Sequence, residues 1–301
     1  METSSNNAAT VQVAGYGKHP AWSDHIEGLG AANPVLSKIE GELYLGAIGS
    51  LITSGDWPSG SSSHAMARTV RRFLWQNAAD FVFGWMWPSA DEVGRDHYPM
   101  ILCVHVTGAE AGAVVPLLDP LVQKAMHVIR ASRLREEVLS AVQTLEAQAR
   151  AAVRSVPPDG EAQPLQRAEQ WVNAGPLDKT RWQRLLYFLK TQYADAAIAE
   201  TGSRLTASKR SGAQEFEGMR LPLPAASGPG ALSDWLAFLR TQLRANAPAL
   251  LIQPEGADWC DIVVGVVNAT TLKPILGPLD VVYPVTDVPF EITPELAEEA
   301  E

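Results

Sequence analysis

The chain has 301 residues, of which 46% are hydrophobic and 19% charged, and its formal net charge is −10 at pH 7. The hydrophobic content excludes a fibrous or wholly unfolded chain, and the acidic balance disfavours binding to nucleic acid or to an anionic membrane. No apolar stretch approaches the roughly 18 residues needed to span a bilayer, so no membrane insertion is expected. The first nine residues, METSSNNAA, hold no basic residue and no apolar core, so no secretory signal is expected there. Two well-separated cysteines, Cys103 and Cys260, are typical of a reduced, cytoplasmic protein.

A strand and then a helix are predicted near the amino terminus. Residues 11–13 alternate with polar neighbours and run into Gly15-Tyr16-Gly17, which is typical of a short strand that ends in a tight turn. A helix is expected from Pro34, because Asn33 can cap it and apolar residues then recur at spacings of three and four up to Leu51.

The next stretch predicts a second helix and two core strands. The helix is expected over residues 65–79, with Arg68, Arg71 and Arg72 grouped on it. Residues 81–87 and 100–106 are short apolar runs bounded by Pro, Gly and Asp, a pattern that favours strands buried on both faces. Loops held by such strands often carry function, which directs attention to the polar residues 88–99 between them.

The middle of the chain predicts helices. Asp119-Pro120 is expected to cap and open the longest one, whose apolar stripe continues to Leu145 before the Pro157-Pro158-Asp159-Gly160 stop. A second helix is expected near Asp178 and a third after a Ser233 cap.

Two further strands, at residues 249–252 and 262–267, follow these helices around a Pro254-Glu255-Gly256 turn. Strands on both sides of the helices predict an α/β fold, specifically a three-layer αβα sandwich with a mixed sheet. We expect a single domain over residues 11–290 with a helical insertion around 119–218. Before it lies a disordered stretch, 1–10, and after it an acidic tail, 291–301, which holds five glutamates and no base.

Catalytic signatures are weak. Gly15 to Lys18 resembles a phosphate-binding loop, but the spacing of a P-loop fails at Gln12 and His19. No Gly-x-Ser-x-Gly elbow occurs, and Cys103 sits in an apolar run where a thiolate is poorly stabilised. We therefore expect no enzyme and no cofactor.

One enzymatic alternative stays open. All six histidines lie in the first 127 residues, and a metal could be held by His19, Asp24, His25 and His97 if their loops converge. Alternatively, Lys18 and Arg95 could bind an anionic substrate. A third reading is a structural module packed into a larger assembly, which would expose an apolar patch.

Two loop tryptophans are candidate contacts with a protein partner. Trp22 and Trp57 lie beside Pro and Ser in loop-like sequence, and exposed aromatic residues are enriched at protein interfaces.

Two sequence blocks carry a family resemblance. Gly17-Lys18-His19-Pro20-Ala21-Trp22-Ser23-Asp24, followed by Pro88-Ser89-Ala90-Asp91-Glu92-Val93-Gly94-Arg95 before Tyr98-Pro99, resembles the TagF (ImpM) family of type VI secretion accessory proteins. The resemblance is clear over residues 11–107. The chain departs from the family pattern at Ser23, where the family usually has Gly, and at His25, where it has an aromatic residue.

The resemblance implies a cytoplasmic, non-enzymatic α/β sandwich that restrains type VI secretion after translation. The implied partner is a forkhead-associated scaffold protein of the secretion apparatus. The positions within the two motif blocks that we carry forward as structural or interaction residues are Lys18, Pro20, Asp24, Ser89, Asp91, Gly94 and Arg95.

The same residues suggest a physical role. Ser89 and Asp91 can bond backbone amides in a turn, whereas Arg95 needs a planar acceptor such as a carboxylate. We hypothesise that Lys18, Asp24, Asp91 and Arg95 form one charge network that locks the turn after the first strand to the turn between the two core strands.

Overall fold

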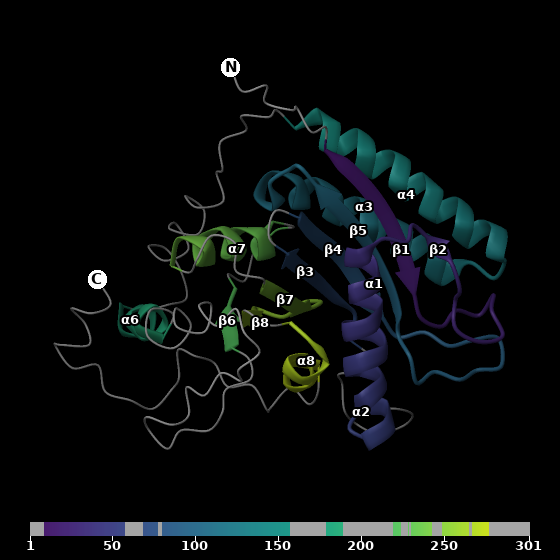
Figure 1. The fold of residues 1–301 in the computed structure, drawn as a ribbon, viewed down its shortest axis with the longest axis horizontal. Coiled ribbons are helices and arrows are strands. Elements are labelled where there is room, and N and C mark those ends of the chain that lie inside the picture. Colours follow the sequence, from purple (N-terminus) through teal and green to yellow (C-terminus); the bar gives the residue numbers. More distant parts are fainter. Residues whose placement is uncertain are drawn as a thin grey trace.

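The sheet is entirely antiparallel. The computed structural model describes residues 9–57, 69–77, 80–156, 179–188, 219–223, 228, 230–242, 249–264 and 267–276. These residues form an eight-stranded open sheet of order β2-β1-β5-β4-β3-β7-β8-β6, packed against helices (Figure 1). The strands are β1 (Thr10–Tyr16), β2 (Leu29–Gly30), β3 (Arg71–Asn77), β4 (Asp80–Trp87), β5 (Met100–Thr107), β6 (Met219–Pro222), β7 (Ala249–Pro254) and β8 (Trp259–Val264).

The fold is α/β, as predicted, but the prediction of a mixed sheet is wrong. Every neighbouring pair of strands is antiparallel. Short connections explain two of these pairs, because β3–β4 and β7–β8 are each consecutive in the chain and joined by loops too short for a parallel crossover.

The strands predicted at residues 11–13, 81–87, 100–106 and 249–252 are confirmed, whereas the helix expected over residues 65–79 is wrong. Its described part contains β3, which pairs with β4 and β7. The aromatic residues Phe73 and Trp75 favour a strand and are buried on one face of the sheet. Of the grouped arginines, Arg68 lies outside the described residues, whereas Arg71 and Arg72 belong to β3, and Arg72 pairs with Asp119 on the other face of the sheet.

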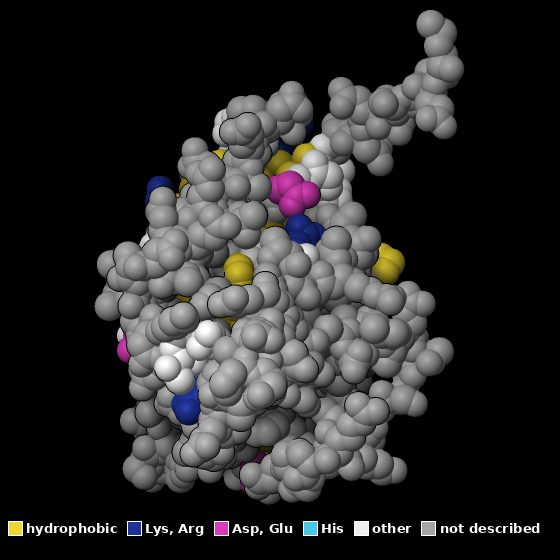
Figure 2. Space-filling view, turned by 90° about the vertical axis from the view of Figure 1, so that its left-hand side faces the viewer, with side chains coloured by type: hydrophobic (Ala, Val, Ile, Leu, Met, Phe, Trp, Pro, Cys, Tyr) yellow, Lys and Arg dark blue, Asp and Glu magenta, His cyan; other side chains and the backbone are white. Residues whose placement is uncertain are grey.

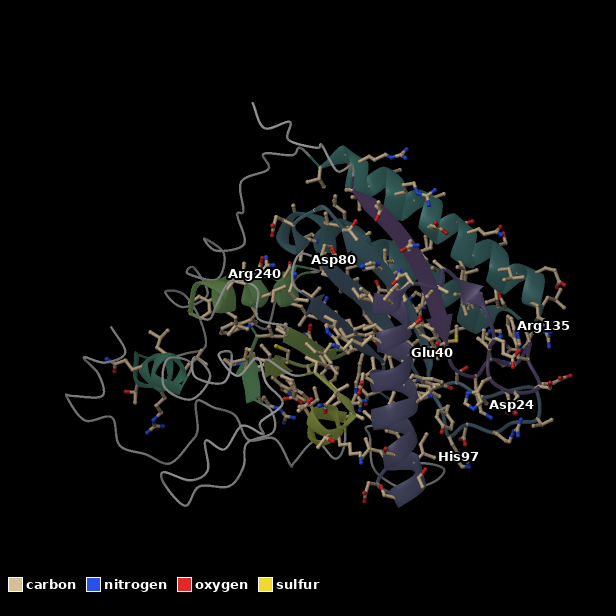
Figure 3. The ribbon with its side chains drawn as sticks, in the orientation of Figure 1. Asp24, Glu40, Asp80, His97, Arg135 and Arg240 are labelled. Carbon is tan, nitrogen blue, oxygen red and sulfur yellow. The ribbon has the colours of Figure 1, made fainter. Side chains whose placement is uncertain are left out.

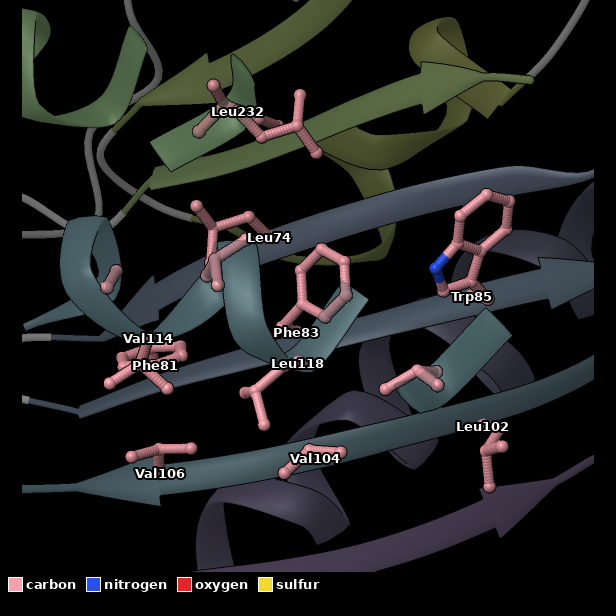
Figure 4. Close-up of a cluster of buried hydrophobic side chains, with 14 of the residues drawn as sticks. Leu74, Phe81, Phe83, Trp85, Leu102, Val104, Val106, Val114, Leu118 and Leu232 are labelled. Atoms are coloured by element: carbon pink, nitrogen blue, oxygen red, sulfur yellow. The ribbon is translucent and has the colours of Figure 1, made fainter. Parts of the chain in front are cut away.

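One face of the sheet packs against α3 (Ala111–Ala131), α4 (Arg135–Ser155) and α7 (Ala231–Gln242). Alternate residues of β4 and β5 enter this core, among them Phe81, Phe83, Leu102 and Val104. Figure 4 shows these side chains together with Val114 and Leu118 of α3. The large core on this face fixes α3 and α4 against the strands that carry the two motif loops.

The other face is covered by a continuous helical segment and by α8 (Ala269–Leu276), which the sequence analysis did not predict. The segment comprises α1 (Pro34–Lys38), a π-helical stretch η1 (Ile39–Ile48) and α2 (Gly49–Ser54). Its predicted start is confirmed, since the Asn33 side chain accepts a hydrogen bond from Leu36 N at 2.9 Å. Cys103 faces this second core.

The boundaries of the long helix differ from the prediction. The helix begins at Ala111, not at Asp119, and the apolar stripe divides into α3 and α4 around Ser132. Asp119 does not cap the helix, because its carboxylate accepts hydrogen bonds from Arg72 Nη1 at 2.7 Å and Trp85 Nε1 at 2.8 Å. A short-range capping pattern was thus outweighed by a buried long-range ion pair.

The remaining helices include α6 (Lys179–Phe188), which begins close to the predicted start at Asp178. In α7, Ser233 lies within the first turn and donates to Gly230 O, so the helix starts two residues before the predicted cap. No helix in the described part of the chain is long and apolar enough to cross a membrane.

Several predictions fall outside the described residues. The tail 291–301 and residues 1–8 lie there, whereas Thr10 is the first residue of β1. Much of the expected insertion at 119–218 also lies there, and the domain boundaries stay a prediction.

In Figure 2, the described side chains on the visible face are scattered singly and do not gather by type.

Candidate functional site: a charge network between two motif loops

The first motif block forms a tight loop after β1. Gly17 has a φ of +124°, and a Cβ atom there would lie 2.1 Å from Pro99 O, so only glycine permits this approach to the second loop. Gly17 O accepts from Ile26 N at 2.8 Å, and Lys18 pairs with His25 in an isolated antiparallel bridge. Residues 17–26 therefore return to their starting point beside β5.

The second motif block forms a turn built around Asp91. Asp91 Oδ1 accepts from Val93 N at 3.2 Å and from Arg95 N at 2.9 Å, as expected for an aspartate that bonds its own turn. Gly94 adopts a φ of +85°, a left-handed conformation that favours glycine, and its N–H donates to Asp91 O.

The four charged side chains of the network hypothesis lie together. Asp91 Oδ2 accepts from Lys18 Nζ at 2.8 Å and from Arg95 Nε at 2.6 Å. Lys18 Nζ also lies 3.4 Å from Asp24 Oδ1, and Arg95 Nη2 donates to Ser23 O at 2.6 Å. A backbone bond from Glu92 N to Trp22 O adds to these contacts. Asp91 is thus the centre through which both loops are joined.

The network is buried at its centre and exposed at its edge. The side chains of Lys18 and Asp91 are 6% and 0% exposed, whereas those of Asp24 and Arg95 are 63% and 48% exposed. Burial opposes the ionisation of Asp91, but the bonds from Lys18 and from the amide and guanidinium of Arg95 outweigh it and hold the pKa of Asp91 well below its usual range. The backbone N–H of His25 is the main cause that lowers the pKa of Asp24.

The first loop is also fixed to the α3–α4 hairpin. His19 Nε2 donates to Ile129 O at 2.8 Å, and its Nδ1 accepts from Ala21 N at 3.1 Å. Arg135 Nε donates to Ala21 O at 2.8 Å, and its guanidinium lies 5.3 Å from the centre of the Trp22 ring. Figure 3 shows Asp24 and Arg135 at the same end of the molecule. Sequence reasoning missed Arg135, because nothing local in the sequence links it to residues 19–22.

The histidines of the metal alternative have other partners. Both ring nitrogens of His19 are engaged, and burial lowers the pKa of His19. His25 Nδ1 lies 2.5 Å from Tyr44 Oη, and its ring packs edge-on against Tyr98. His97 is exposed beside Asp96. The described residues contain no group of three or more His, Cys, Asp or Glu side chains able to hold a metal ion.

The other predicted site residues have mixed outcomes. Trp57 is 5% exposed and packs in the core of the second face, so its prediction as an exposed contact is wrong. The turn that follows α2 brings it there, through a bond from Trp57 N to Leu51 O. Trp22 is partly buried between His19 and Arg135. Pro20 and Ser89 are also partly buried, and the structure does not bring Ser89 into the described network.

The surface above the network combines charged and apolar groups. Val93 is 67% exposed at the tip of the second loop, next to the exposed Glu92 and Arg95. Asp91 Oδ1 holds the backbone of this tip through the N–H groups of Val93 and Arg95. We call this surface, made by Asp24, Glu92, Val93 and Arg95, the motif surface.

A scan against models of protein families finds no match, and neither does a search of curated proteins. Among solved structures, the protein PA0076 from Pseudomonas aeruginosa PAO1 is distantly similar to this chain, with 18% sequence identity and a TM-score of 0.32. The match covers 49% of this chain and 63% of the other, so this chain spans less than two thirds of that protein.

Proposed function

We propose that this chain is a cytoplasmic regulatory protein of a type VI secretion system, which restrains assembly or firing by binding another protein. A forkhead-associated scaffold of the apparatus is the proposed partner. The protein is proposed to act without a cofactor and not as an enzyme. The two sequence blocks that resemble the TagF (ImpM) family are the basis of this proposal.

One observation supports the proposal above the others. The two blocks meet in a single charge network, which lies beneath the exposed motif surface. Lys18 pairs with Asp91, and Asp91 also pairs with Arg95, so both buried side chains are engaged within the protein. Burial raises the pKa of the Cys103 thiol to about 12, which makes it a poor nucleophile at neutral pH.

An affinity pull-down from the native cytoplasm tests the proposal. Val93→Glu places a charge at the tip of the motif surface, and Leu45→Glu is the matched control, because Leu45 is 55% exposed on η1. We expect wild type and Leu45→Glu to recover type VI secretion components, with recovery at least about tenfold lower for Val93→Glu, as at a binding hot spot.

Two results would overturn the proposal in different ways. If folded wild type recovers no secretion component, the assignment to the secretion system is wrong. If Val93→Glu and Leu45→Glu recover the partner equally well, the partner binds elsewhere. Thermal unfolding of each variant checks that a loss of recovery does not come from misfolding.

A further inference from the structure

A groove runs between α3 and α4, on the side of this hairpin away from the sheet core. It has a volume of about 510 Å³. The buried residues Ala125, Ala141 and Leu145 lie at its base, where the two small alanine side chains leave room for a neighbouring ridge, and Leu121 and Val128 belong to its wall. It is distinct from the motif surface, which is formed by loops.

The hairpin also carries most of the exposed large apolar side chains. Six such residues occur in the described part of the chain, and four of them, Leu117, Val128, Leu134 and Leu139, belong to α3, α4 or their junction. Leu117, Leu121 and Val128 recur at spacings of four and seven, so they share one stripe of α3 beside the groove. A concentrated apolar stripe beside a hollow is typical of a protein interface.

The charges around the groove indicate the occupant. Lys124 lies on the α3 side, and Glu136 and Glu137 lie on the α4 side. Both signs are therefore present on one surface, which makes it complementary to itself. In a two-fold symmetric dimer each copy offers the same patch, so a basic residue of one copy can meet an acidic residue of the other.

We propose that this surface binds a second copy of the chain, with α3 of each copy seated along the groove of the other. If two α3 helices cross antiparallel between residues 124 and 125, Leu121 of one copy faces Val128 of the other. Lys124 then approaches the α4 helix of the second copy, where the carboxylate of Glu137 can accept a hydrogen bond from the Lys124 ammonium group. The stripe that is exposed in one chain becomes buried in the dimer.

Sedimentation equilibrium of the full chain tests the dimer. We expect wild type to approach twice the mass of one chain with a dissociation constant at or below the micromolar range. Val128→Glu should raise this constant at least about tenfold, as at an interface hot spot. Leu139→Glu is the matched control: Leu139 is 42% exposed on α4 but does not line the groove, so this variant should dimerise normally.

Exchanging the charges of Lys124 and of the two glutamates distinguishes the proposed pairing from nonspecific hydrophobic association. Lys124→Glu and the double variant Glu136→Lys/Glu137→Lys should each dimerise more weakly alone, and an equimolar mixture of the two should regain association. A monomeric wild type up to about 100 μM, a hundredfold above a micromolar dissociation constant, would overturn the proposal. So would equal weakening by Val128→Glu and Leu139→Glu, or a mixture that fails to associate. None of these results depends on the motif surface.

Discussion

Lys18 Nζ lies 2.8 Å from Asp91 Oδ2, in a contact between residues 73 positions apart in the chain. This ion pair joins the loop after β1 to the loop between β4 and β5, and both partners are buried. Removing one member of such a pair leaves the other charge inside the protein without full compensation, which is costly. The stability of the two motif loops should therefore depend on it.

Lys18→Met should lower the free energy of unfolding by about 3 kcal/mol, the lower end of the range for a broken buried pair, because Arg95 still compensates Asp91. Urea unfolding measures the change. Lys273→Met is the control, since Lys273 is exposed on α8 and surface substitutions usually change stability by less than about 0.5 kcal/mol. Equal midpoints for the two variants would show that the pair contributes nothing.

Comparing Gly17→Ala with Gly94→Ala distinguishes the cost of a steric clash between the two loops from the cost of a positive φ alone. Both glycines have positive φ, but an added Cβ meets Pro99 O at 2.1 Å at position 17 and nothing within 4 Å at position 94. We expect about 1–2 kcal/mol of destabilisation for Gly94→Ala and more than about 4 kcal/mol, or failure to fold, for Gly17→Ala. Similar unfolding free energies for the two variants would contradict the close approach of the loops.

The ionised carboxylate of Asp91 stabilises the folded state, so the free energy of unfolding should decrease when the pH is lowered. Its pKa is lower in the folded state than the ordinary value of 3.8, so its contribution is present above that value and is lost as the pH falls toward the folded pKa. Asp91→Asn should be less stable than wild type at pH 7, and the difference should shrink below about pH 4. Unfolding midpoints measured across this range test it, with the exposed Asp96→Asn as control. A difference that does not change with pH would contradict the charged pair.

His19 predicts a second pH dependence, near neutrality. Burial lowers its folded pKa below the ordinary value of 6.5, so the unfolded chain binds the proton more readily. The contribution of neutral His19 is present above pH 6.5 and is lost as the pH falls below it. His19→Gln should reduce the loss of stability between pH 7 and pH 5, whereas the exposed His97→Gln should not. Identical pH profiles for wild type and His19→Gln would refute this role.

Periodicity predicted the core strands well, because residues 81–87 and 100–106 are apolar on both faces and β4 and β5 are buried on both. It failed where a tertiary contact decides the structure. Arg68, Arg71 and Arg72 have the spacing of one helical face, yet Arg72 pairs with Asp119, 47 positions away. Because its carboxylate is engaged in this pair, Asp119 does not cap the helix as the sequence predicted.

The candidate site was predictable to the extent that its chemistry is local. An arginine next to a turn needs a carboxylate, and Asp91 supplies it four residues before Arg95. The supports from α3 and α4 were not predictable, because Ile129 and Arg135 contact the first loop only through the folded hairpin. Trp57 resembles a loop residue in sequence, but a turn after α2 buries it.

The most direct test of the proposed function is the amount of type VI substrate secreted by cells of the source organism that lack this chain. We predict that secretion increases without the chain, returns to the wild-type level with wild type or Leu45→Glu, and stays high with Val93→Glu at equal protein abundance. Unchanged secretion in cells that lack the chain would contradict a restraining role, and full complementation by Val93→Glu would contradict action through the motif surface.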